Sequence, residues 1–78
     1  MTIYDFAKLT KDEKATTTWN GIFLARREKE SIKFALYAVE NFFVEVTYDV
    51  ISNEILNFTP SQTKRLFEEY LNDISIDI

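Results

Sequence analysis

The sequence predicts an α+β domain: a four-stranded antiparallel β-meander with an N-terminal helical segment and a C-terminal helix, in the order α-β-β-β-β-α. Between Ile32 and Tyr48 every even-numbered position is apolar except Glu40. Because successive strand side chains point to opposite faces of a sheet, this alternation is typical of a β-hairpin with one face on a core. Helix-start sequences near both ends of the chain supply the other two observations.

Two capping boxes begin the chain. Thr2-Ile-Tyr-Asp5 and Thr10-Lys-Asp-Glu13 each combine a hydroxyl with a carboxylate, which together satisfy free N–H groups in the first turn of a helix. They predict a short helical turn followed by a helix over about residues 11–18. The side chains expected to face inward are Ile3, Phe6 and Ala7, then Ala15 and Trp19. Gly21, the sole glycine, is expected to end this helix with a positive φ.

The strands are expected over about residues 22–27, 32–38, 42–49 and 54–58, with Ile22 and Leu24 inward in the first. The even-numbered positions of the second and third strands share a face only if their connecting loop has odd length. A three-residue loop, Val39-Glu40-Asn41, meets this condition and places Asn41 in the left-handed conformation that asparagine tolerates. In the fourth strand both Ile55 and the pair Leu56 and Phe58 are candidates for the inward face.

A helix is predicted from Thr59-Pro-Ser-Gln62, which supplies an N-cap hydroxyl, a proline at the first helical position and a glutamine at the third. Its apolar face is formed by Leu66, Phe67, Tyr70, Leu71 and Ile74. The tail over residues 75–78 is either frayed or an added edge strand.

Composition limits the classes of function. The 78 residues, 1–78, form one domain, and without cysteine its stability depends on packing or on a partner subunit. No apolar run approaches the roughly 20 residues that span a bilayer, and no leader precedes the domain, so we expect a soluble cytoplasmic protein that is not a membrane protein. A net charge of −4, with Glu28 and Glu30 interrupting the basic cluster of Arg26, Arg27 and Lys29, argues against nucleic acid as a partner.

The sequence does not favour an enzyme. With neither histidine nor cysteine, it lacks the commonest general base and the strongest nucleophile at neutral pH. Glu45 and Asp49 are the one carboxylate pair considered on the sheet, and four residues along a strand separate them by roughly 13 Å, which is too far for a tight catalytic pair. No catalytic residue, metal site or cofactor is therefore expected, and acidic pairs such as Glu68-Glu69 lack the pattern of a calcium loop.

Two sites for binding remain. The outer sheet face is expected to hold a half-apolar patch, with Phe23, Ala35, Tyr37, Phe43, Glu45 and Thr47 as the candidate interaction surface. Either a helix or the tail covers this patch, or its aromatic side chains only stabilise the sheet, or it is the contact surface of a homodimer or a protein partner. An exposed sheet edge offers a second route to self-association.

The alternative is a small-molecule pocket between the sheet and the helices, near Trp19, Tyr48 and Tyr70. Trp19 and Tyr70 have a second interpretation as core side chains. The function predicted from the sequence is thus a small protein-interaction module, with a small-molecule binding domain as the alternative.

Overall fold

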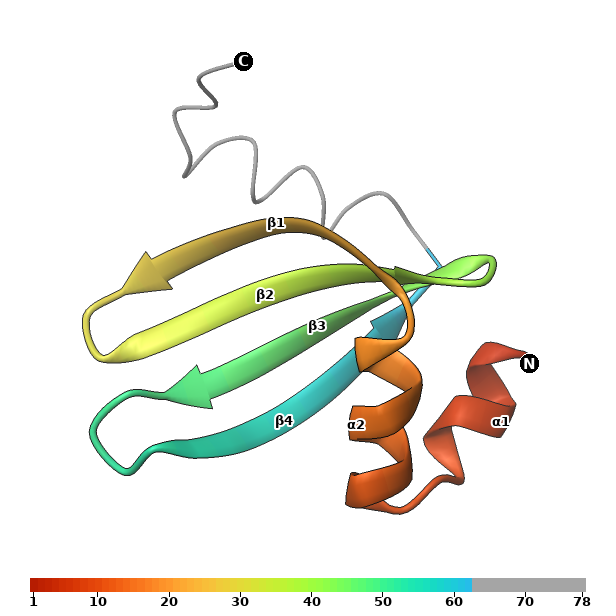
Figure 1. The fold of residues 1–78 in the computed structure, drawn as a ribbon, viewed down its shortest axis with the longest axis horizontal. Helices are drawn as coiled ribbons and strands as arrows, with labels where there is room; N and C mark the ends of the chain where they lie inside the picture. Colours follow the sequence, from red (N-terminus) through yellow and green to blue (C-terminus); the bar gives the residue numbers. More distant parts are fainter. Residues whose placement is uncertain (63–78) are drawn as a thin grey trace.

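A computed structural model describes residues 1–62, which form one antiparallel sheet with two helices packed against it (Figure 1). The elements are α1 (Ile3–Ala7), α2 (Lys11–Trp19), β1 (Ile22–Lys29), β2 (Ile32–Val39), β3 (Phe42–Asp49) and β4 (Glu54–Ser61). The strands pair in sequence order, β1-β2-β3-β4. The predicted α+β class and the four-stranded meander are therefore confirmed.

Both predicted capping boxes are present. The Thr2 hydroxyl accepts from the Asp5 N–H while the Asp5 carboxylate accepts from the Thr2 N–H, and Thr10 and Glu13 repeat the arrangement at the start of α2. Phe6 is fully buried, whereas Ala7 is exposed, so the expectation that Ala7 faces inward is wrong. The short first helix is thus held by its cap and by one buried ring.

The core lies between the helices and one face of the sheet. It contains Phe6, Val39, Phe42, Val44, Val46 and Phe58, with Ala15 among the partly buried side chains around it. Figure 1 shows both helices at the end of the sheet where β1 begins, opposite the β1–β2 and β3–β4 turns. The half of this face nearest those turns is therefore not covered by α1 or α2.

The predicted register between β2 and β3 is wrong by one residue. Val39 pairs with Phe42 and Leu36 pairs with Glu45, so the turn contains two residues, and Glu40 rather than Asn41 has the positive φ. Directly opposed residues lie on the same face of a sheet. The apolar stripe of β3 therefore faces the core as predicted, whereas β2 packs its odd-numbered positions on the core and presents Leu36 on the opposite face.

The fourth strand extends further than predicted. Thr59, Pro60 and Ser61 pair with β3, so the prediction that a helix begins at Thr59 is wrong. Proline is compatible with β4 because this is an edge strand of the described sheet, and edge strands are where proline is tolerated. The register shifts opposite Tyr48, so Ile55 and Phe58 both lie on the core face and Leu56 is exposed. The rest of the predicted C-terminal helix and the tail lie outside the described residues.

Gly21 is not a positive-φ cap, because its φ is negative. It instead permits a close approach: a Cβ at this position would lie 2.5 Å from the Ala38 carbonyl oxygen and 3.1 Å from the Thr18 carbonyl oxygen. The chain therefore turns from α2 into β1 against the backbone of β2, in a space that only glycine fits.

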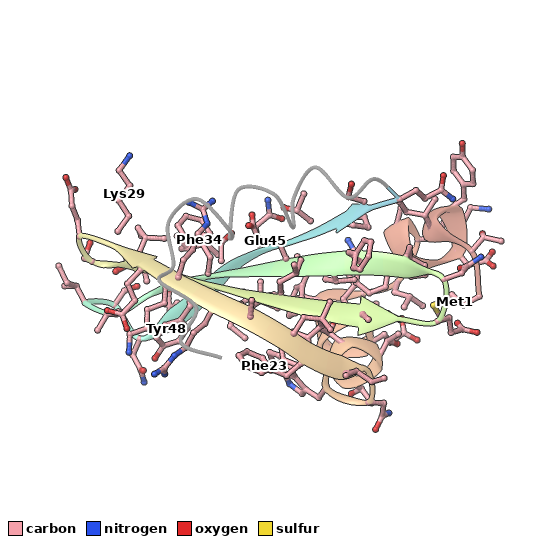
Figure 2. All side chains as sticks on the ribbon, turned by 90° about the horizontal axis from the view of Figure 1, so that it is seen from above. Met1, Phe23, Lys29, Phe34, Glu45 and Tyr48 are labelled. Atoms are coloured by element: carbon pink, nitrogen blue, oxygen red, sulfur yellow. The ribbon has the colours of Figure 1, made fainter. Side chains whose placement is uncertain are left out.

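The face of the sheet opposite α1 and α2 carries a buried ion pair. Glu45 and Arg27 approach within 3.7 Å, with side-chain exposures of 10% and 15%, and the Arg27 guanidinium lies 4.2 Å from the centre of the Phe34 ring. Figure 2 shows Glu45 and Phe34 on one side of the sheet and Phe23 and Tyr48 on the other. The two faces thus have different chemistry, one with a charged pair at its centre and the other with an aromatic surface.

Candidate functional site

The half of the helix-bearing face that α1 and α2 do not cover forms a cavity of about 340 Å³, which we call the aromatic hollow. Its walls carry four aromatic side chains of the helix-bearing face: Trp19, Phe23, Tyr37 and Tyr48. Cross-strand pairing explains why they meet, since Phe23 pairs with Tyr37 and Lys33 pairs with Tyr48, and paired residues share a face. Ala35, Val46 and Ile55 supply aliphatic surface between the rings.

Three of these aromatic side chains form a connected row that reaches Phe58 in the core. The centroid of the Tyr37 ring lies 5.6 Å from that of Phe23 and 5.4 Å from that of Trp19, and Trp19 lies 6.0 Å from Phe58 in the core. These separations and the tilted or edge-to-face angles fall within the favourable range for aromatic pairs. The hollow is therefore built on side chains whose positions are fixed by one another and by the core.

The row ends at exposed rings. Trp19 is 48% exposed and Phe23 is 53% exposed, although both contact Tyr37. Trp19 comes from the last residue of α2 and Phe23 from β1, so the turn at Gly21 brings them to the same side of the sheet. The Trp19 side chain is thus half-buried, and its ring connects the hollow to Phe58 in the core.

One rim of the hollow is charged. Arg26, Glu28 and Lys33 line it, and Glu28 pairs with Lys33 at 3.7 Å. Arg26 is exposed and forms no ion pair with any residue in the described part of the chain. Arg27 and Phe34, which the register assigns to the opposite face, also border the cavity. The rim therefore carries excess positive charge in a chain whose net charge is −4.

Tyr48 connects the hollow to the β3–β4 turn. Its phenol donates a hydrogen bond to the Asn53 side-chain oxygen, and Asn53 has a φ of 59°. Asparagine is among the residues that tolerate this left-handed conformation best. The hydrogen bond orients the phenol toward the turn and leaves the Tyr48 ring as a wall of the hollow.

The structure divides the interaction surface predicted from the sequence. Phe23, Ala35 and Tyr37 line the hollow on the helix-bearing face. Phe43, Glu45 and Thr47 belong to the opposite face, because they pair with Ala38, Leu36 and Phe34. The six residues therefore form two groups of three on opposite faces and not the single patch that the predicted register implies.

Two residues of the predicted pocket come together. Trp19 and Tyr48 both line the hollow, and Tyr70 lies outside the described residues. Sequence reasoning missed Arg26, Val46 and Ile55 as neighbours of Trp19. Non-local registers place them there: the two-residue β2–β3 turn sets Val46 opposite Ala35, the β1 register shift at Leu24 sets Arg26 opposite Ala35, and the β4 register shift sets Ile55 opposite Tyr48.

Titration and metal binding do not add a second site in the described part of the chain. The pKa values of Asp5 and Glu13 are lowered, mainly because each carboxylate accepts a hydrogen bond from the N–H of its capping threonine. Both belong to helix starts and neither lines the hollow. Within residues 1–62, no group of three or more acidic side chains is arranged to hold a metal ion. No helix among these residues has the length and apolar character needed to cross a bilayer.

Comparison of the chain with protein-family models, with curated proteins and with solved structures gave no match. Function must therefore be argued from the chemistry of the site, because a fold of this kind does not specify an activity.

Proposed function

We propose that this chain is a protein-interaction module that self-associates through the aromatic hollow. The observation that carries the proposal is the row of aromatic rings that begins in the core and ends at the half-exposed Trp19 and Phe23. Tryptophan, tyrosine and arginine dominate the energetics of protein interfaces, and they meet here as Trp19, Tyr37 and Arg26. Because the rings pack on one another, binding a partner costs little side-chain entropy.

The sheet edges support this choice of surface over edge pairing. β1 has a register shift at Leu24, and β4 has one near Leu56 together with Pro60. Bulges and prolines are the devices by which proteins prevent strand addition at an exposed edge. The aromatic hollow is therefore the better supported of the two routes to self-association that the sequence suggests.

The proposed role is binding without catalysis, at a site with no cofactor. The side chains of the hollow are aromatic, aliphatic or of the Arg, Lys and Glu types, and its one hydroxyl contact in the described structure is the Tyr48 hydrogen bond to Asn53. The absence of cysteine from the sequence fits a reducing compartment, so a cytoplasmic location belongs to the proposal.

Light scattering across a concentration series tests the proposal with three proteins. The wild type is expected to be a dimer at high concentration. Phe23→Glu, which adds a charge at the exposed end of the aromatic row, is expected to be a folded monomer by circular dichroism. Tyr4→Glu is the matched control, because Tyr4 is an aromatic residue that is 76% exposed on α1 and does not line the hollow. A wild type that stays monomeric at every concentration would overturn self-association.

A small-molecule binding domain is the second candidate, favoured by the cavity volume. About 340 Å³ lies near the lower end of the roughly 300–1,000 Å³ found for ligand pockets. Trp19 is the sole tryptophan, so its fluorescence reports directly on this cavity. Titration of a monomeric wild type with anilinonaphthalene sulfonate, a dye with apolar rings and one sulfonate charge, would support this candidate if Phe23→Glu weakened binding and Tyr4→Glu, which adds the same charge elsewhere, did not.

A further inference from the structure

The β3–β4 turn carries apolar side chains that face solvent. Ile51 is 84% exposed and Val50 is 44% exposed, next to one another at the end of the sheet. The Ile51 N–H donates to the Asp49 carboxylate at 3.0 Å, which fixes the backbone of this turn. An ordered turn that presents adjacent apolar side chains has the character of a contact element, since exposed apolar groups that cluster mark interaction sites.

Acidic residues stand on both sides of these apolar side chains. Asp49 and Glu54 pair with each other at the base of the turn, and we call residues 49–54 the apolar turn tip. Glu54 is exposed and forms no ion pair with another residue in the region 1–62. The tip therefore presents an aliphatic side chain beside an available carboxylate.

The aromatic hollow has the complementary chemistry. Its floor and walls are apolar rings and aliphatic side chains, and its rim carries Arg26, which has no acidic partner in residues 1–62. Glu28, the acidic residue of the rim, is already paired with Lys33. An aliphatic side chain beside a carboxylate therefore complements the hollow in two ways. The aliphatic group matches the apolar lining, and the carboxylate matches the unpaired positive charge of Arg26 on the rim.

Three other exposed side chains in residues 1–62, Tyr4, Phe23 and Leu24, match the hollow less well. Tyr4 has an acidic neighbour, but the Asp5 carboxylate is engaged in the capping box of α1. Phe23 and Leu24 precede the two arginines of β1, so their surroundings carry the same sign of charge as the rim. The surroundings of the apolar turn tip therefore favour contact with the hollow more than those of these three side chains.

We propose that the apolar turn tip of one copy occupies the aromatic hollow of a second copy, with Ile51 against the rings and Glu54 facing Arg26. This inference rests on the self-association proposed above and names the element that inserts. The tip of a chain does not fill its own hollow, since Ile51 is almost fully exposed. The hollow extends to Lys33 and Tyr48, at the end of the sheet that also carries the tip (Figure 1). A two-fold dimer that pairs these ends forms the tip–hollow contact twice.

Ile51→Glu tests the apolar contact. Because Ile51 is exposed, the variant is expected to fold as the wild type does, which circular dichroism checks. The dimer dissociation constant from sedimentation equilibrium is expected to rise by about tenfold or more, as for loss of a central apolar anchor. Ile51→Val retains a branched aliphatic side chain and is expected to change the constant by much less. A wild-type constant for Ile51→Glu would overturn the inference.

A charge exchange tests the pairing of Glu54 with Arg26. Both side chains are exposed, so neither Arg26→Glu nor Glu54→Arg is expected to prevent folding. Each single variant is expected to weaken the dimer, and the double variant in one chain is expected to restore it, since each reversed charge again meets its opposite. A double variant as weak as the sum of the two single variants would contradict this contact.

Mixing two defective variants separates this inference from the proposed function. Phe23→Glu retains an intact tip, and Ile51→Glu retains an intact hollow. Their mixture is expected to form a heterodimer with one native contact and to show a higher dimer fraction than either variant alone. A wild-type monomer would overturn the proposed function and this inference together. A dimer that depends on Phe23 but not on Ile51 would overturn the inference alone.

Discussion

At the scale of single residues, Gly21 has a function that its place after a helix does not reveal. Gly21→Ala is expected to lower the free energy of unfolding by about 1–3 kcal/mol, because the added Cβ collides with the backbone oxygen of Ala38. Gly21→Asn distinguishes the two possible reasons for glycine at this position, a positive-φ helix cap and a close approach of the backbone. Asparagine is tolerated at a positive-φ cap but not in a narrow space, so urea denaturation should find it at least as destabilising as alanine. The neighbouring Asn20→Ala serves as an exposed control.

The second prediction at this scale concerns the Arg27–Glu45 ion pair. Both side chains are largely buried, so Glu45→Gln and Arg27→Met are each expected to destabilise the fold. The double variant should lose about 1–2 kcal/mol less than the sum, as residues in contact are coupled. The exposed Glu28–Lys33 pair offers a control, for which the corresponding coupling should be at most about 1 kcal/mol. Additive effects of Glu45→Gln and Arg27→Met on the urea midpoint would mean that the buried pair is not coupled.

Residue types explain why the β-turns were predicted only in part. Glu30 and Glu40 both adopt positive φ values, 57° and 51°, at turn positions where glycine or asparagine would be the usual signal. Asn41, adjacent to Glu40, carries that signal, and for this reason the sequence predicts a β2–β3 loop one residue longer than the observed turn. The two-residue β2–β3 turn also places Glu45 at a buried position, and hydrophobic patterning alone argues against burying a carboxylate. The compensating partner, Arg27, lies on a different strand and cannot be found from local sequence.

At the scale of secondary structure, the capping boxes are the elements best predicted by sequence, because they depend on residues three apart. They also give a pH prediction. The hydrogen bond from the Thr10 N–H lowers the folded-state pKa of Glu13 below the unfolded value of about 4.5. The ionised Glu13 carboxylate therefore stabilises the fold fully above that unfolded value, and this stabilisation is lost as the pH falls through the lower folded-state pKa. Glu13→Gln keeps an acceptor for Thr10 but does not titrate.

Thermal unfolding from pH 7 to pH 3 measures the effect. The wild type should be more stable than Glu13→Gln at pH 7, and the difference should shrink as the pH falls from about 4.5 toward 3. Lys11, in the first turn of α2 and outside the capping box, provides the control Lys11→Gln, whose difference from wild type should not follow this profile. A Glu13→Gln difference independent of pH would contradict the assigned hydrogen bond.

At Thr59-Pro60 the local sequence predicts the wrong secondary structure. A hydroxyl followed by proline is typical of a helix start, yet here these residues extend β4 opposite Glu45 and Val44. The same two residues are acceptable at a sheet edge, where proline is tolerated. Local sequence allowed both structures, and pairing with β3, a non-local interaction, decided between them.

At the scale of the whole molecule, the class, strand order and most strand boundaries could be predicted, whereas the two faces could not. A shift of one residue at the β2–β3 turn exchanges the faces of β2 relative to β3. For this reason Phe43 was wrongly joined to the correctly grouped Phe23 and Tyr37, whereas Arg26 was missed because of the register shift at Leu24 in β1. Trp19 and Tyr48 were found because their positions beside the helix and in the stripe of β3 did not depend on that turn.

The attachment of the helices to the sheet gives the last prediction. Phe6 is fully buried and meets Phe42 edge to face at 5.7 Å, although α1 has only five residues and would not be stable by itself. Phe6→Ala is expected to cost about 3–5 kcal/mol. The whole domain is expected to have roughly 4–12 kcal/mol of stability, so this variant should be close to unfolding.

Urea denaturation followed by far-ultraviolet circular dichroism measures this loss, and Tyr4→Ala is the control from the same helix. Tyr4 is 76% exposed, so its removal should change stability by no more than about 0.5 kcal/mol. Trp19 fluorescence recorded in the same experiment adds a local report, since its ring packs on Phe58 in the core that Phe6 completes. If Phe6→Ala and Tyr4→Ala had equal midpoints, α1 would not be docked in solution, and the core at this end of the sheet would be formed by α2 and the strands.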